Sequence, residues 1–168
     1  MDNISESRLA LIHPTVAAKV REAADALSAQ GIEVRVVQGL RSWNDQAALY
    51  AKGRTLINGQ WKITDPKLIV TRCVPGNSWH NFGLAIDMAP DDPAIAGYQP
   101  DWNAGHPSWK AMIDAFKASG FVDGAEFRSF PDNPHFQMTG RFPVNPTDEV
   151  RQLFKDGGVK GVWSEIGL

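Results

Sequence analysis

The sequence predicts an α+β fold, in which a small antiparallel sheet is flanked by helices. Apolar residues recur at helical spacing in several segments that begin at a capping residue or proline and end near a glycine. Between these segments lie short runs in which apolar and polar residues alternate, as they do in half-buried strands. The length of 168 residues fits a single domain over 1–168, which we divide into a core at about 10–140 and a C-terminal helical extension at 144–168.

Four segments have the pattern of helices. The first follows His13 and Pro14, because proline is tolerated in the first helical turn, and Gly31 ends it. Ser108 and Thr147 are the expected N-caps of two later helices. The expected helical ranges are 14–31, 44–52, 108–120 and 147–156, with a last helical turn or two within 159–166.

The first expected strand is 32–37, where apolar and polar residues alternate. Residues 54–77 have the composition of a long loop, with short strand pieces expected around Ile57 and at 68–70.

Two further strands, 84–88 and 135–138, place polar side chains opposite their apolar faces. In 84–88 the even-numbered residues are apolar and share one face, so Asp87 lies on the other. In 135–138, His135 and Gln137 lie opposite the apolar residues in the same way. If the two strands are antiparallel neighbours, Asp87 and His135 come within a few ångströms of each other.

A second histidine, His80, precedes the first of these strands, and Gly83 allows the sharp approach that would bring it to the same place. Two neutral imidazoles and one carboxylate form a common catalytic zinc set that leaves a fourth position for water. Asp132, three residues before His135, is a further carboxylate that can move protons. These residues point to a metal-dependent hydrolase with a zinc site at the sheet surface.

Composition excludes several other classes of protein. The net charge is −2, from 17 basic and 19 acidic residues, which gives no reason to expect nucleic acid or an anionic membrane as partner. The single cysteine, Cys73, cannot form an internal disulfide and is expected to be a half-buried filler rather than a nucleophile. We expect no membrane segment, because no apolar run approaches the roughly 20 residues that a membrane helix needs. We expect no secretory signal either, and therefore synthesis in the cytoplasm.

The pattern Ser-x-His-x-x-Gly-x-Ala-x-Asp at 78–87, followed by Asp-x-Pro-His-Phe at 132–136, resembles the M15 family of zinc peptidases. The segments 39–55 and 126–130 are similar to the endolysin-like branch of that family, so the resemblance covers about 10–140. It implies one Zn²⁺ per chain, held by His80, Asp87 and His135. It also implies that Asp132 is the general base and that Arg41 polarises the scissile carbonyl. The residues expected to support the site are Ser78, Gln46 and Glu126, the last also as a back-up base.

The activity implied by the resemblance is hydrolysis of the peptidoglycan stem peptide at the L-alanyl-D-glutamate bond by a metal-activated water. The resemblance further implies a monomeric phage or prophage endolysin that reaches the cell wall through a separate pore-forming protein. One alternative is a D-alanyl-D-alanine carboxypeptidase or dipeptidase, which would need an extra cationic residue in the cleft for a free carboxylate. Another is a non-catalytic, zinc-stabilised cell-wall-binding domain, which would have no need of Asp132 or Arg41.

Overall fold

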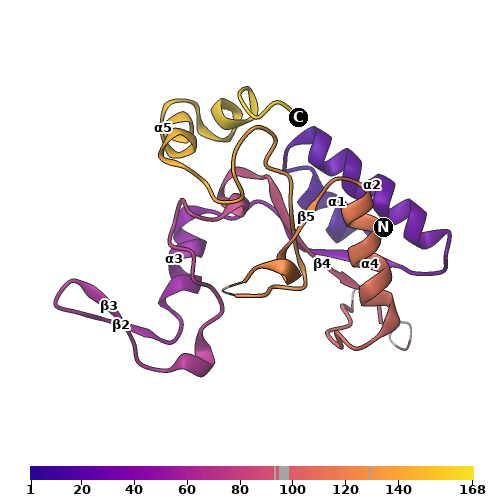
Figure 1. Cartoon of the computed structure of the whole chain (residues 1–168), viewed down its shortest axis with the longest axis horizontal. Helices are drawn as coiled ribbons and strands as arrows, with labels where there is room; N and C mark the ends of the chain where they lie inside the picture. The colour runs from indigo at the N-terminus through magenta and orange to yellow at the C-terminus, as the bar shows by residue number, and fades with distance from the viewer. Residues whose placement is uncertain (93, 95–98, 129) are drawn as a thin grey trace.

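The computed structural model describes residues 1–92, 94, 99–128 and 130–168 (Figure 1). Ser129, in the second of the two family-like segments, lies outside these residues. The helices, with η for short 3₁₀ helices, are α1 (Asn3–Leu9), α2 (Pro14–Ser28), α3 (Trp43–Ala51), η1 (Pro66–Leu68), η2 (Trp79–Phe82), α4 (Pro107–Ala118), η3 (Gly124–Glu126) and α5 (Asp148–Trp163). The strands are β1 (Val34–Gln38), β2 (Arg54–Ile57), β3 (Gln60–Ile63), β4 (Ala85–Pro90), β5 (Val122–Asp123) and β6 (His135–Gln137).

The main sheet has four strands in the order β1-β4-β6-β5, and every neighbouring pair is antiparallel. The expected pairing of the two motif strands is therefore confirmed. In the register of β4 and β6, Asp87 lies directly opposite His135 and Ile86 lies opposite Phe136. The sheet thus brings together two side chains that are far apart in the chain.

The apolar core lies between the sheet and the helices α1, α2 and α4. Helices α2 and α4 pack against each other, α1 and α2 contact β1, and α4 contacts β4 (Figure 1). Ile86, Met88 and Phe136 are fully buried, as are the apolar stripes of α2 and α4. Because side chains alternate across a strand, burying these residues turns Asp87 and His135 to the other face of the sheet.

A β-hairpin forms the first part, residues 54–63, of the loop expected at 54–77. Strands β2 and β3 pair around Asn58 and Gly59, which both have positive φ, and the hairpin extends away from the body of the molecule (Figure 1). An Asn-Gly pair between two short runs is a strong hairpin signal, and it was overlooked. The strand expected at 68–70 was wrong: residue 68 ends η1 and the next two residues have no regular structure.

The helix ends partly match the expectations. Thr147 caps α5 as expected, with its hydroxyl accepting from the Val150 N–H. The N-cap of α4 is His106 rather than Ser108, because proline occupies the first helical position and the His106 Nδ1 accepts from the Ser108 N–H. Helix α1 was not expected at all, although its N-cap, Asp2, is a preferred capping residue.

Helix α5 packs against η2 and so joins the C-terminal segment to the motif that carries His80. Gly158 interrupts α5 with φ 62° and ψ −155°, which separates the two helical stretches expected from the sequence. Beyond it, the indole Nε1–H of Trp163 donates to the Phe82 carbonyl at 2.7 Å. Within the described ranges, α5 and the other helices are all too short or too polar to cross a membrane.

Gly83 ends η2 in the left-handed conformation, at φ 66°. An added Cβ would lie 3.1 Å from the Trp163 ring and 3.3 Å from the Ile12 Cα, whereas at Gly31, with φ 76°, it would meet nothing within 4 Å. Gly31→Ala therefore measures the backbone strain alone, about 1–2 kcal/mol. We expect Gly83→Ala to lower the free energy of unfolding by more than Gly31→Ala, as measured by denaturant titration. Equal losses would show that the contacts around Gly83 relax freely.

Candidate metal centre

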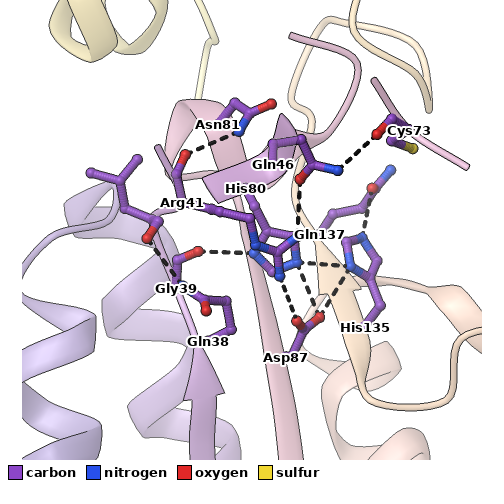
Figure 2. Close-up of polar contacts among 11 residues, drawn as sticks. Gln38, Gly39, Arg41, Gln46, Cys73, His80, Asn81, Asp87, His135 and Gln137 are labelled. Atoms are coloured by element: carbon purple, nitrogen blue, oxygen red, sulfur yellow. Dashed lines mark hydrogen bonds and ion pairs between the residues drawn. The ribbon is translucent and has the colours of Figure 1, made fainter. Parts of the chain in front are cut away.

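His80 is positioned by η2, which carries it, and by a backbone carbonyl group of the turn that follows β1. Its side chain is 2% exposed, and its Nδ1 lies 2.9 Å from the Gly39 carbonyl oxygen (Figure 2). A carbonyl can only accept, so this contact places the ring proton on Nδ1. The unprotonated Nε2 then faces Asp87 and His135.

His135 is oriented in the same way by its neighbour on the strand. Its Nε2 lies 3.0 Å from the Gln137 side-chain oxygen, so Nε2 carries the proton and Nδ1 is left to bind a metal (Figure 2). Gln137 is on the same face of β6 because it is two residues further along the strand. The sequence pattern placed Gln137 on this face but did not reveal that it orients His135.

The three ligand atoms form a small triangle on the sheet. The His80 Nε2 lies 3.0 Å from the Asp87 Oδ1 and 3.1 Å from the His135 Nδ1, and the latter two atoms are 3.4 Å apart. Ligands about 2.0–2.1 Å from a tetrahedral zinc ion lie about 3.3 Å from one another. The donor types and their spacing therefore fit a metal ion with a fourth position facing away from the protein ligands.

Burial and neighbouring charges shift the pKa values of the three candidate ligands in different directions. Burial lowers the pKa of His80, which keeps this imidazole neutral. Burial also opposes ionisation of Asp87, but its contacts with the imidazole rings of His80 and His135 hold its pKa well below the usual range. For His135, burial is outweighed by the hydrogen bond and charge of Asp87, which raise its pKa. The cluster thus contains an ionised carboxylate, as a metal ligand must be.

Arg41 borders the cluster and is held at both ends of its guanidinium group. Its Nη2 donates to the Asp87 Oδ2 at 3.2 Å, and its Nη1 donates to the Gln46 side-chain oxygen at 3.1 Å (Figure 2). Gln46 is fully buried on α3, and its Nε2 donates to the Cys73 carbonyl at 2.8 Å. Gln46 therefore fixes the position of Arg41 and ties it to the chain segment that follows the hairpin.

A cleft of about 530 Å³ opens over the cluster, and Arg41, His80, Asp87, Asp132 and His135 all line it. The Asp132 backbone is anchored on both sides, because its N–H donates to the Gly124 carbonyl and its carbonyl accepts from the His135 N–H. Burial, and then the negative charge of Asp87, raise the pKa of the Asp132 carboxyl. The structure thus places a partly buried acid beside the three ligand atoms.

The remaining residues expected at the site are placed differently. Ser78 lies in the cleft wall but its side chain makes no capping bond to η2. Glu126 is exposed, forms an ion pair with Lys117 of α4 and does not line the cleft, so the structure does not bring it to the site. Cys73 is half-buried in the cleft wall, and burial raises the pKa of its thiol, as expected for a filler rather than a nucleophile.

Two cationic residues of the cleft were not expected from the sequence. Arg72 and Arg128 both line it, in addition to Arg41. Arg72 belongs to no motif that the sequence shows, and Arg128, although it lies in the family-like segment 126–130, was given no role there. Only the folded chain shows that they lie on the cleft.

Comparison with known proteins agrees with the fold and the cluster. Residues 72–138 match an M15 peptidase family described as D-alanyl-D-alanine carboxypeptidase. The chain is 36% identical over 135 residues to the peptidoglycan L-alanyl-D-glutamate endopeptidase CwlK of Bacillus subtilis, covering 76% of this chain and 73% of that protein.

Solved structures share the fold at lower identity. The L-Ala D-Glu endopeptidase ChiX of Serratia marcescens is 20% identical, with a TM-score of 0.59 over 94% of this chain and 92% of that one. The vancomycin resistance D,D-pentapeptidase VanY, solved in complex with Zn(II), is 18% identical, with a TM-score of 0.53 over 88% of this chain and 80% of that one. The similarity to CwlK, the matched motif region and the metal-binding geometry agree with one another. They show that the chain belongs to the M15 family of metallopeptidases.

Proposed function

We propose that this protein is a zinc-dependent peptidoglycan peptidase that cleaves the stem peptide between L-alanine and D-glutamate. The observation that carries the proposal is the cleft built around His80, Asp87 and His135, whose ligand atoms have the spacing of a tetrahedral zinc site. The choice of bond is supported by the 36% identity to CwlK, a peptidoglycan L-alanyl-D-glutamate endopeptidase.

In this proposal His80, Asp87 and His135 would hold a zinc ion, which would supply Lewis acidity and lower the pKa of a bound water. Asp132 accepts the proton of the attacking water and donates it to the amine that leaves. Arg41 faces the same cleft and offsets the negative charge that develops on the carbonyl oxygen. Gln46 and Asp87 hold the guanidinium, so Arg41 is oriented before the substrate arrives.

A second candidate is a D-alanyl-D-alanine carboxypeptidase, and the cationic residues of the cleft are the observation that favours it. Arg72 and Arg128 are suited to a free C-terminal carboxylate. They are equally suited to D-glutamate, because its α-carboxylate stays free when the chain continues through its γ-carboxyl group. We prefer the endopeptidase because the similarity to CwlK is greater than that to the D,D-peptidases of known structure.

The biological setting stays a prediction from the sequence resemblance. It comprises the role as a phage or prophage endolysin, passage through a separate pore-forming protein, and action as a monomer. The single-domain organisation over 1–168 is likewise our proposal, supported by the packing of α5 against η2.

Product analysis tests the bond that is cleaved. Digestion of purified peptidoglycan should release peptides with N-terminal D-glutamate or isoglutamine and leave L-alanine on the muramic acid. Mass spectrometry of the products identifies both ends. The turbidity of a cell-wall suspension should also fall, since this cut separates the cross-linked peptide from the glycan. Free D-alanine as the sole product would instead establish the carboxypeptidase.

The role of Asp132 is tested by comparison with a ligand residue. Asp132→Ala should lower kcat by about 10²–10⁴, the usual contribution of a general base, while zinc content stays near one ion per chain. His80→Ala removes a ligand and should lower both activity and zinc content. Zinc is measured by elemental analysis and kcat with a synthetic stem peptide. Wild-type turnover by Asp132→Ala would show that another group is the base.

The role of Arg41 is tested by a substitution that keeps its charge. Arg41→Ala should lower kcat by about 10²–10³. Arg41→Lys keeps the charge but loses the planar fork that contacts Gln46 and Asp87 at once, so it should restore only part of that loss. The melting temperature should change little, because a cation remains beside Asp87. A large drop in melting temperature, with unchanged kcat per folded molecule, would assign Arg41 a purely structural role.

A further inference from the structure

We propose that Arg72, together with Arg128 of the same cleft, forms a subsite for the free α-carboxylate of the D-glutamate on the leaving side of the cleaved bond. The inference rests on the proposed function and adds a distinction between two natural forms of the substrate. Stem peptides carry either D-glutamate or its α-amide, isoglutamine, at this position. A cationic subsite favours the charged form.

The backbone around Arg72 is fixed relative to the metal cluster. The Cys73 carbonyl, one residue on, accepts from the Gln46 Nε2, and the other end of the same side chain holds Arg41 (Figure 2). The Thr71 carbonyl, one residue before, accepts from the Arg54 guanidinium at 3.0 Å. Arg72 therefore projects from a segment that is anchored on both sides, and one anchor belongs to the site itself.

The guanidinium of Arg72 reaches a second segment that lines the cleft. It lies over the ring of Phe130 at 5.6 Å from the centroid, within the range of a cation–π contact. Phe130 and Arg128 come from the segment that leads to Asp132, and all three line the cleft. The two cations thus come from two different segments that line the same cleft as the three expected metal ligands.

Arg72 and Arg41 differ in whether their guanidinium groups already have polar partners within the protein. Arg41 is engaged by Asp87 and Gln46. Within residues 1–92, 94, 99–128 and 130–168, neither Arg72 nor Arg128 forms an ion pair with an acidic side chain. Both are exposed, so a substrate can reach them. They are the cations of the cleft that remain available to an anionic group.

In the proposed substrate, the α-carboxylate of D-glutamate lies next to the cleaved bond. The α-carboxylate of D-glutamate is attached to the same carbon as the nitrogen of the cleaved bond, and it stays free because the next residue is joined through the γ-carboxyl. When the carbonyl of the cleaved bond faces the cluster, this carboxylate remains inside the same cleft. Arginine binds carboxylates through two parallel hydrogen bonds, which an α-amide cannot reproduce.

The test compares two peptides, N-acetyl-L-alanyl-γ-D-glutamyl-L-lysine and the same peptide with the D-glutamate α-carboxyl amidated. We expect the wild-type protein to favour the carboxylate peptide about tenfold in kcat/KM, as for an exposed charge-assisted hydrogen bond. Arg72→Gln should bring the ratio close to one, and Arg128→Gln should lower it less. The matched control is Lys62→Gln, which removes an exposed charge on β3 outside the cleft and should leave the ratio unchanged.

A binding measurement separates the subsite from the reaction. Calorimetric titration of the zinc-loaded Asp132→Asn protein should show tighter binding of the carboxylate peptide, and the added Arg72→Gln substitution should remove that preference. Equal affinity for the two peptides, or a preference that survives Arg72→Gln, would overturn the subsite. Cleavage of a D-alanyl-D-alanine peptide and of neither test peptide would overturn the proposed function, and the calorimetric ratio would still decide whether the carboxylate subsite exists.

Discussion

The register of β4 against β6 is the constraint on which the metal centre depends. It sets Asp87 opposite His135, and a shift by one residue would turn one of these side chains into the apolar core. Fully buried residues on the core face, Ile86 and Phe136, oppose such a shift because it would expose them. The hydrophobic core therefore determines the geometry of a polar site on the other side of the sheet.

The two histidines of the site, His80 and His135, are each held by a hydrogen-bond acceptor that leaves the other ring nitrogen free to bind a metal ion. The Gly39 carbonyl and the Gln137 amide oxygen each accept one imidazole proton. Fixing the tautomer in this way removes a rearrangement that metal binding would otherwise require. Arg41 meanwhile donates to the second oxygen of Asp87, and the first oxygen faces the two imidazole nitrogens that would share the metal ion with it. A buried charge is tolerated only with such partners.

Features of the site that follow from a motif or from alternating apolar residues could be predicted from the sequence. Features that depend on contacts between residues far apart in the chain could not. Residues that repeat every second position placed Asp87 and His135 on one face, and the order of the motifs placed His80 beside them. The bond from Gln46 to the Cys73 carbonyl joins residues 27 positions apart and leaves no periodic trace. The cleft positions of Arg72 and Arg128 were missed for the same reason. Helix α1 and the Asn58-Gly59 turn, in contrast, have local signals that a closer reading would have used.

The residues that the sequence motifs identify are those expected to carry out the reaction, whereas the cleft residues that could choose the substrate were not identified from the sequence. Under the proposed function, the ligand set and Arg41 would act on any peptide bond placed over the metal site, so they could not by themselves select an L-alanyl-D-glutamate bond. Selection would then depend on other groups of the cleft wall, and these include residues 70–73, 127, 128 and 130. The described residues of these two segments belong to no strand of the sheet, so the sheet register does not constrain their side chains. Change in these two segments can therefore alter the preferred stem peptide without disturbing the metal centre.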